Sequence, residues 1–211
     1  MTEARIIQRV VKPILWVAGL APFGYLVRAF LTGHLEAEPV KGMEHFTGRT
    51  AIIILFIALC VTPARRLTGI NGLIKVRRLI GLFAFFYALL HFSIFLVFDL
   101  ELSFGELAGE VVKRPWITVG FSALLILTAL AITSPQAMVR RLGGKRWRAI
   151  HRLVYLAAVL GIVHFLWSQK KDMTLPVRYA VVLGIIFATK IVVARRRDPP
   201  RRTVGDRSPA S

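Results

Sequence analysis

Long apolar runs, separated by shorter polar and basic segments, dominate the sequence. Each run is close to the roughly 20 residues that an α-helix needs to cross the hydrocarbon core of a bilayer. Proline stands near an end of several runs, where a helix tolerates it. The pattern predicts an all-α integral membrane protein built as a six-helix transmembrane bundle. The predicted spans are residues 13–31, 46–63, 79–98, 115–133, 149–168 and 177–194.

The charges between the spans alternate from one connection to the next. Most lysines and arginines precede the first span, lie in the second and fourth connections, or follow the last span, whereas the first and third connections are acidic. Because cytoplasmic connections are enriched in Lys and Arg, both termini are predicted to be cytoplasmic. We expect a transmembrane domain over residues 1–194. Residues 195–211 are expected to form a basic, disordered cytoplasmic tail that could touch anionic lipid headgroups.

Composition narrows the class of protein. The chain is 55% hydrophobic and carries a formal net charge of +18, with a mean hydropathy of +0.61. Such a charge could indicate nucleic-acid binding, but the Lys and Arg residues lie between apolar runs and not along one helix face, so no nucleic-acid partner is expected. The single cysteine, Cys60, excludes a disulfide framework and a cysteine metal cluster.

Two histidines inside predicted spans are the main candidates for chemistry, because ionisable groups in a membrane are costly. With a rise of about 1.5 Å per residue, His91 lies roughly 20 Å and His164 roughly 25 Å from the cytoplasmic end. Imidazoles from two helices at similar depth suit the axial positions of one haem. Either histidine could instead simply hydrogen-bond a neighbouring helix. Aromatic neighbours that could flank a porphyrin are Phe85, Phe86, Phe92, Phe95, Phe165 and Trp167.

A third histidine, His151, lies only about 6 Å inside the cytoplasmic end of the fifth span. Its neighbours Arg148 and Arg152 are typical of a residue near lipid headgroups. His151 also precedes His164 by 13 residues, which rotates the two side chains apart by about 220° on an ideal helix. Either Gly161 permits a local irregularity, or the two histidines serve different sites.

Several short segments together resemble the MsrQ (YedZ) family, haem-binding membrane subunits of the periplasmic protein-methionine-sulfoxide reductase system within the ferric-reductase-like transmembrane group. The resemblance extends through nearly the whole chain. The segments that carry it are Pro39-Val40-Lys41, His45-Phe46-Thr47-Gly48-Arg49, Arg77-Arg78-Leu79-Ile80-Gly81-Leu82, Leu90-His91, Arg114-Pro115, Thr133-Ser134-Pro135-Gln136-Ala137-Met138, Gly144-Lys145-Arg146-Trp147, Leu153-Val154-Tyr155 and His164-Phe165-Leu166-Trp167.

This resemblance implies b-type haem, an associated FMN and a place in the bacterial inner membrane. It also implies electron delivery to a periplasmic molybdopterin subunit, MsrP, which reduces methionine sulfoxide in oxidised periplasmic proteins. The electrons would come from the quinone pool or from a cytoplasmic flavin reductase. His91, His151 and His164 match the haem-ligand positions of the family.

The number of haems is a separate question. Relatives with two stacked haems carry a second histidine on the third helix, 13 or 14 residues from the first, where this sequence has Arg78 and Arg77. We therefore expect one firmly held haem at His91 and His164. A second haem at His151 would be weaker, or would use an unusual ligand such as Arg77.

The source of electrons is also constrained. Ferric reductases and NADPH oxidases carry a cytoplasmic domain that binds flavin and nicotinamide after the last span. In this sequence the last predicted span is followed by the short tail at residues 195–211. A separate electron donor is therefore expected.

Two other functions fit part of the pattern. One is a small transporter in which the histidines relay protons, although the sequence lacks an internal repeat and only Pro22-Phe23-Gly24 interrupts a span. The other is a self-contained quinol- or ascorbate-type cytochrome with a different acceptor. A Soret band separates the transporter from both haem proteins, and co-purification with a molybdenum subunit separates the two haem proteins from each other.

Overall fold

The chain folds into a bundle of long helices. The structure, a computed structural model, describes residues 5, 7–34, 38–70, 72–169 and 172–195, so the predicted tail lies almost wholly outside the described residues. Six helical segments are long and apolar enough to cross a membrane, which confirms the predicted six-helix architecture. The helices are η1 (Ile7–Val11), α2 (Lys12–Leu31), α3 (Pro39–Thr68), α4 (Leu73–Ile94), η2 (Phe95–Asp99), α5 (Phe104–Lys113), α6 (Pro115–Ile132), α7 (Gln136–His151), α8 (Leu153–Ser168) and α9 (Thr174–Arg195).

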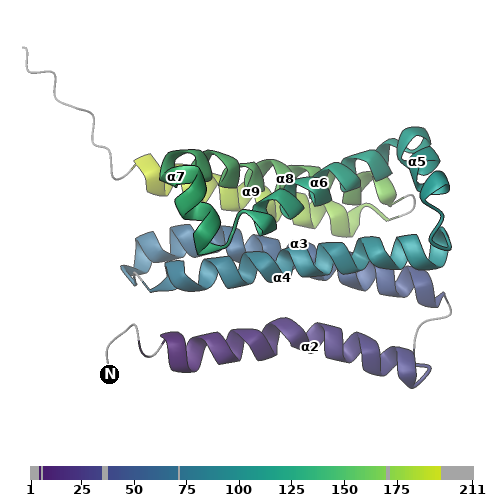
Figure 1. Cartoon of the computed structure of the whole chain (residues 1–211), viewed down its shortest axis with the longest axis horizontal. Coiled ribbons are helices and arrows are strands. Elements are labelled where there is room, and N and C mark those ends of the chain that lie inside the picture. The colour runs from purple at the N-terminus through teal and green to yellow at the C-terminus, as the bar shows by residue number, and fades with distance from the viewer. Residues whose placement is uncertain (1–4, 6, 35–37, 71, 170–171, 196–211) are drawn as a thin grey trace, which may run out of the picture.

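The spans form three layers. Figure 1 shows α2 alone on one side, α3 and α4 in the middle, and α6, α8 and α9 on the other side. The short helix α5 lies at one end of the bundle and α7 lies at the other, which we call the α5 end and the α7 end. The start of α2 and the last turn of α9 both lie at the α7 end.

Two connections that looked like loops in the sequence are helical. α5 begins after Ser103, whose hydroxyl oxygen accepts a hydrogen bond from the backbone N–H of Glu106 at 3.3 Å, the usual arrangement of an N-terminal cap. α7 is broken at Gly143, which has a φ of 72° and a ψ of 148°. α5 is too short, and α7 too polar, to form a membrane span by itself, so long apolar runs in the sequence do not reveal either helix.

Small and apolar side chains fill the contact between the middle layer (α3 and α4) and the layer of α6, α8 and α9. α3 packs along α4, and α6 packs along α8. Leu59, Ala84, Ala157 and Ala158 are almost completely buried in the largest hydrophobic cluster. Small residues at such crossings let helix backbones approach closely, which is how membrane helices gain packing contacts.

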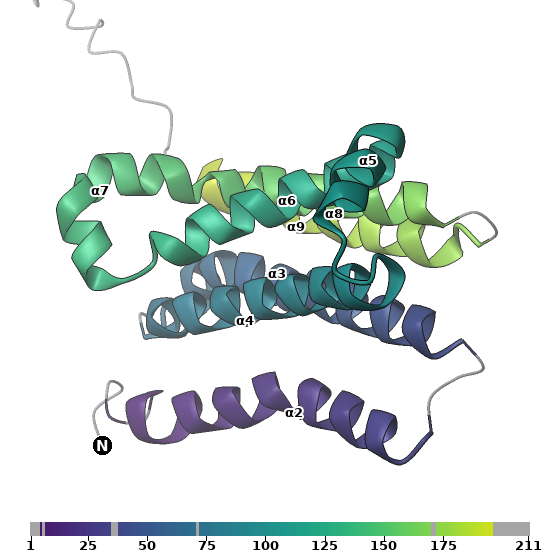
Figure 2. The ribbon, with the colours of Figure 1, turned by 45° about the vertical axis from the view of Figure 1, so that its right-hand side comes forward.

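Helix α2 is joined to α4 through a hydroxyl group inserted at a proline kink. Pro22 lies inside α2, and the ribbon of α2 bends at mid-length (Figure 2). The hydroxyl of the fully buried Tyr87 donates to the Gly19 carbonyl at 2.7 Å and accepts from the Phe23 N–H at 3.0 Å. Gly19 and Phe23 are four residues apart, so Tyr87 bridges a donor and an acceptor that a regular helix would pair directly.

Replacing this tyrosine should therefore destabilise the bundle. Tyr87→Phe keeps the ring but leaves the Phe23 N–H and the Gly19 carbonyl without their partner, and we expect a loss of about 1–3 kcal/mol in the free energy of unfolding. Denaturation in detergent micelles measures the change. Tyr25→Phe is the matched control, because the Tyr25 side chain, on α2, is 61% exposed. Equal stability of the two variants would contradict the bridging role.

Candidate functional site

A cavity of about 460 Å³ lies in the half of the bundle nearer the α5 end. Residues of α3, α4, α6 and α8 line it, and its inner wall is apolar, with Leu55, Phe92, Leu124 and Leu127 among the lining side chains. Its mouth carries charged and polar side chains. A concave, mostly apolar pocket of this size with a few convergent polar groups is typical of a cofactor or ligand site.

His91 from α4 and His164 from α8 face each other across this cavity. Their ring centroids are 6.1 Å apart and the ring planes meet at 71°. The prediction that these two histidines share a depth is confirmed. His45 lies at the mouth of the same cavity and is exposed.

The backbone of a neighbouring helix orients each imidazole. Nδ1 of His91 donates to the carbonyl of Glu44 on α3 at 3.0 Å, and Nδ1 of His164 donates to the carbonyl of Trp116 on α6 at 2.7 Å. Because a carbonyl oxygen only accepts hydrogen bonds, each neutral ring carries its proton on Nδ1 and a lone pair on Nε2. Metal-binding histidines are commonly oriented in this way. Both Nε2 atoms are therefore prepared to act as ligands.

The arrangement fits a metal held between the two imidazoles. If metal–nitrogen bonds are about 2 Å long, two axial imidazoles place their ring centroids roughly 6 Å apart, which matches the observed 6.1 Å. Within the described residues no group of three or more His, Cys, Asp or Glu could hold a metal ion. The remaining ligands would have to come from the cofactor itself, as the nitrogens of a porphyrin do.

The aromatic surroundings of the cavity differ in part from expectation. Phe92, Phe95 and Phe165 line the cavity, but Phe85, Phe86 and Trp167 do not. Phe86 packs against Phe23 and Tyr87, on the side of α4 that faces α2. The prediction was wrong for these three residues because proximity along a helix does not specify which face a side chain occupies.

Three cationic side chains line the cavity, and two of them are paired with acids. Lys41 forms an ion pair with Glu38, and the hydrogen bond from Lys41 holds the pKa of the Glu38 carboxyl below its usual value. Arg114 pairs with Glu110 at 2.6 Å. Arg49 is partly buried and has no ion pair within the described part of the chain. An unpaired cation inside a span is costly and is by default a candidate for ligand binding.

Arg49 keeps most of its hydrogen-bonding capacity available. Its Nε donates to the carbonyl of His45 at 3.0 Å on the same helix. Within the described residues its two terminal guanidinium nitrogens have no hydrogen bond, and such a pair of nitrogens suits a carboxylate. Arg49 therefore adds an anion-binding group to the cavity wall.

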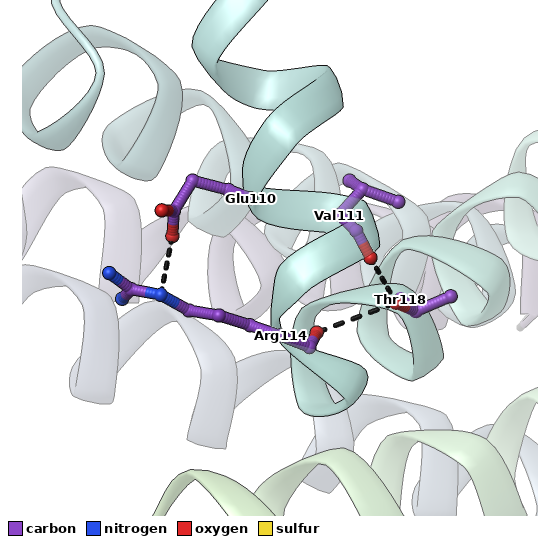
Figure 3. A network of polar contacts seen from close by, with 4 residues as sticks. All are labelled: Glu110, Val111, Arg114 and Thr118. Atoms are coloured by element: carbon purple, nitrogen blue, oxygen red, sulfur yellow. Dashed lines mark hydrogen bonds and ion pairs between the residues drawn. The ribbon is translucent and has the colours of Figure 1, made fainter.

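The first turn of α6, which carries the Trp116 carbonyl, is fixed by a small polar network (Figure 3). Arg114 pairs with Glu110 across the bend between α5 and α6. The hydroxyl of Thr118 donates to the carbonyl of Val111 and, at 3.4 Å, to that of Arg114. These contacts join α5 to the turn that orients His164.

His151 and Arg77 lie outside the cavity, toward the α7 end. The His151 ring stacks on Trp147 with centroids 4.1 Å apart, and its Nε2 is 3.2 Å from the hydroxyl of Thr133. Arg77 donates to the hydroxyl of Thr62 at 3.2 Å and lies close enough to His151 to act on it electrostatically. Among the described residues, no second histidine accompanies them.

A turn at Arg152 separates His151 from α8, but the Arg152 backbone keeps helical dihedral angles, with a φ of −71° and a ψ of −23°. α7 ends at His151 and α8 begins at Leu153, whereas Gly161 lies within α8. One helical segment, Gln136–Ser168, therefore carries both histidines, and their side chains have different partners: His164 lies beside His91, and His151 stacks on Trp147.

The groups that orient the two imidazoles could not be recognised in the sequence. The carbonyls of Glu44 and Trp116 are backbone atoms, which exist at every position and leave no compositional signal. Two glycines beside the rings, Gly48 and Gly120, were also missed.

Comparison with known proteins gives two results. Residues 47–162 match the family described as ferric reductase like transmembrane component. Curated relatives named as heme-binding subunits MsrQ of protein-methionine-sulfoxide reductase include one from Herminiimonas arsenicoxydans, which is 46% identical over 86% of this chain and 84% of its own length. Another, from Rhodospirillum rubrum, is 44% identical over 86% and 88% of the two chains. A third, from Deinococcus radiodurans, is 42% identical over 88% and 92%.

Proposed function

Because this chain belongs to the MsrQ family of ferric-reductase-like transmembrane proteins, we propose that it binds haem b between His91 and His164 and carries electrons across the membrane. The observation that carries the proposal is the pair of facing imidazoles, 6.1 Å apart, each with Nδ1 engaged by a backbone carbonyl. Bound haem would supply a one-electron carrier inside the hydrocarbon layer.

The residues around the cavity would each have a defined task. His91 and His164 would hold the haem through their Nε2 atoms. The carbonyls of Glu44 and Trp116 would hold the rings in one orientation, which keeps the ligand geometry constant between oxidation states. The apolar wall would exclude water, and Arg49 would bind a carboxylate of the macrocycle through its terminal guanidinium nitrogens.

The charge distribution supports one orientation of the bundle in the membrane. The basic connections are at the α7 end, which we assign to the cytoplasm. Both ends of the transmembrane domain over residues 1–194, and the tail at residues 195–211, would then be cytoplasmic. In the bacterial inner membrane, electrons would enter near the α7 end from the quinone pool or a cytoplasmic flavin reductase. They would leave at the α5 end to a periplasmic molybdopterin subunit of the MsrP type, which reduces methionine sulfoxide. FMN is a second cofactor that the family suggests.

We further propose that one haem is held firmly and that any haem at His151 is weak or relies on Arg77. The partners of His151 support this view, because its Nε2 already contacts Thr133 and its ring is stacked on Trp147. The Thr133 contact would have to break before Nε2 of His151 could serve as a ligand.

Haem counting tests the proposal directly. A pyridine haemochrome assay is expected to give one tightly bound haem b per chain in both the wild type and His151→Ala, with His34→Ala, an exposed histidine, as the matched control. Two tightly bound haems in the wild type, both bis-histidine by EPR, would contradict the single firm site. A wild-type protein without a Soret band after haem-replete expression would favour the proton-relay transporter instead.

A further inference from the structure

The two imidazoles are held by the same short pattern on two different helices. His91 donates to the carbonyl of Glu44 on α3, and four residues later α3 has Gly48. His164 donates to the carbonyl of Trp116 on α6, and four residues later α6 has Gly120. In both cases the glycine lies directly against the histidine ring.

Helix geometry explains this spacing. The carbonyl of residue i in an α-helix accepts a hydrogen bond from the N–H of residue i+4. A ring that binds the second lone pair of that carbonyl must therefore approach beside residue i+4. A side chain at that position occupies the space into which the ring has to fit, and glycine leaves the space open.

The close approach is tighter at one histidine than at the other. A Cβ added at Gly120 would lie 2.6 Å from Nδ1 of His164 and 2.9 Å from two of its ring carbons, which no real side chain can tolerate without a shift. A Cβ added at Gly48 would lie 3.3 Å from Nδ1 of His91, which requires only a small displacement. The shorter hydrogen bond, 2.7 Å against 3.0 Å, is also at His164.

We infer that Gly120 and Gly48 are positioning residues that set the orientation of the two imidazoles, with Gly120 the stricter of the two. Local structure does not call for glycine at either position, because alanine is the better helix former and both residues lie inside long helices. A methyl group at position 120 would push His164 away from the Trp116 carbonyl and misdirect its Nε2. This inference rests on the proposed haem site.

Three glycine-to-alanine variants test the inference. Gly120→Ala is expected to weaken the axial bond from His164, so that the reduced haem binds carbon monoxide and the ferric haem gains a high-spin EPR signal. Haem affinity should fall by roughly 10–100-fold, the usual cost of losing the partner that orients a ligand. Gly48→Ala should show the same changes to a smaller extent. Gly81→Ala on α4 is the matched control, because a Cβ there meets nothing within 4 Å.

Folding is monitored separately by size-exclusion chromatography and helical circular dichroism in detergent. If Gly120→Ala does not fold, Gly48→Ala tests the inference by itself. Its clash with the ring is smaller, but the variant should still bind more carbon monoxide than Gly81→Ala does. Folded Gly120→Ala and Gly48→Ala variants with wild-type EPR spectra and no carbon monoxide binding would overturn the inference. A wild type without haem would instead refute the proposed function itself.

Discussion

Alanine in place of His91 or His164 is expected to abolish the stoichiometric low-spin haem of the purified protein. Each substitution removes one of the two imidazole rings that lie 6.1 Å apart in the cavity, and with it one candidate Nε2 ligand. Loss of a ligand should cost more than loss of a residue that merely orients it, so haem affinity should fall by at least about 100-fold. Haem titration of the purified protein, with optical and EPR spectra, measures the loss.

Two features of this experiment separate ligation from folding. Removal of either ring leaves the backbone of the neighbouring helix intact, so His91→Ala and His164→Ala should keep the helical content of the wild type. Added imidazole should restore a low-spin spectrum by occupying the space of the missing ring. His45→Ala is the matched control, because His45 lies at the mouth of the cavity and is exposed. Normal low-spin haem in either of the first two variants would refute the assigned ligands.

Arg49→Gln is expected to weaken the binding of haem but not the binding of haem dimethyl ester, whose carboxylates are blocked. Arg49 lines the cavity and has no ion pair within the described ranges, whereas the other two lining cations are paired. A hydrogen bond to a charged group contributes about 1.5–3 kcal/mol, which corresponds to a change of roughly 10–150-fold in affinity. Parallel titrations of both macrocycles into both proteins give this difference.

The control for Arg49 is Arg178→Gln, which removes an exposed arginine at the beginning of α9, near the same end of the bundle. It should bind both macrocycles as the wild type does. If Arg49→Gln weakens haem and its diester equally, the guanidinium does not bind a carboxylate and its effect is on packing alone.

Much of the architecture could be predicted because the bilayer is a demanding solvent. A backbone in hydrocarbon must pair its own polar groups, so a long apolar run can hardly be anything but a helix. The six predicted spans agree with the structure, although α3 begins at Pro39 and not near residue 46. The extra turns are polar and extend beyond the apolar run, where hydropathy gives no signal. The helices α5 and α7 were missed for the same reason.

The candidate site was predicted only in part. The depth of His91 and His164 followed from their positions in the third and fifth spans, because the rise of a helix is constant. The distance between their rings did not follow, since it depends on how α4 and α8 pack. The sequence also did not show that Arg49 lacks an ion pair among the described residues, because Lys41 and Arg114 look equivalent to it in the sequence.

By itself, the sequence determined that the chain crosses a membrane six times and carries two histidines at one depth, because hydrophobicity and helical rise are local properties. Only the tertiary structure decided that the two rings face each other and that the Glu44 and Trp116 carbonyls orient them. It also decided that Gly48 and Gly120 leave room for them. These features depend on the approach of helices distant in the sequence, which no local pattern encodes.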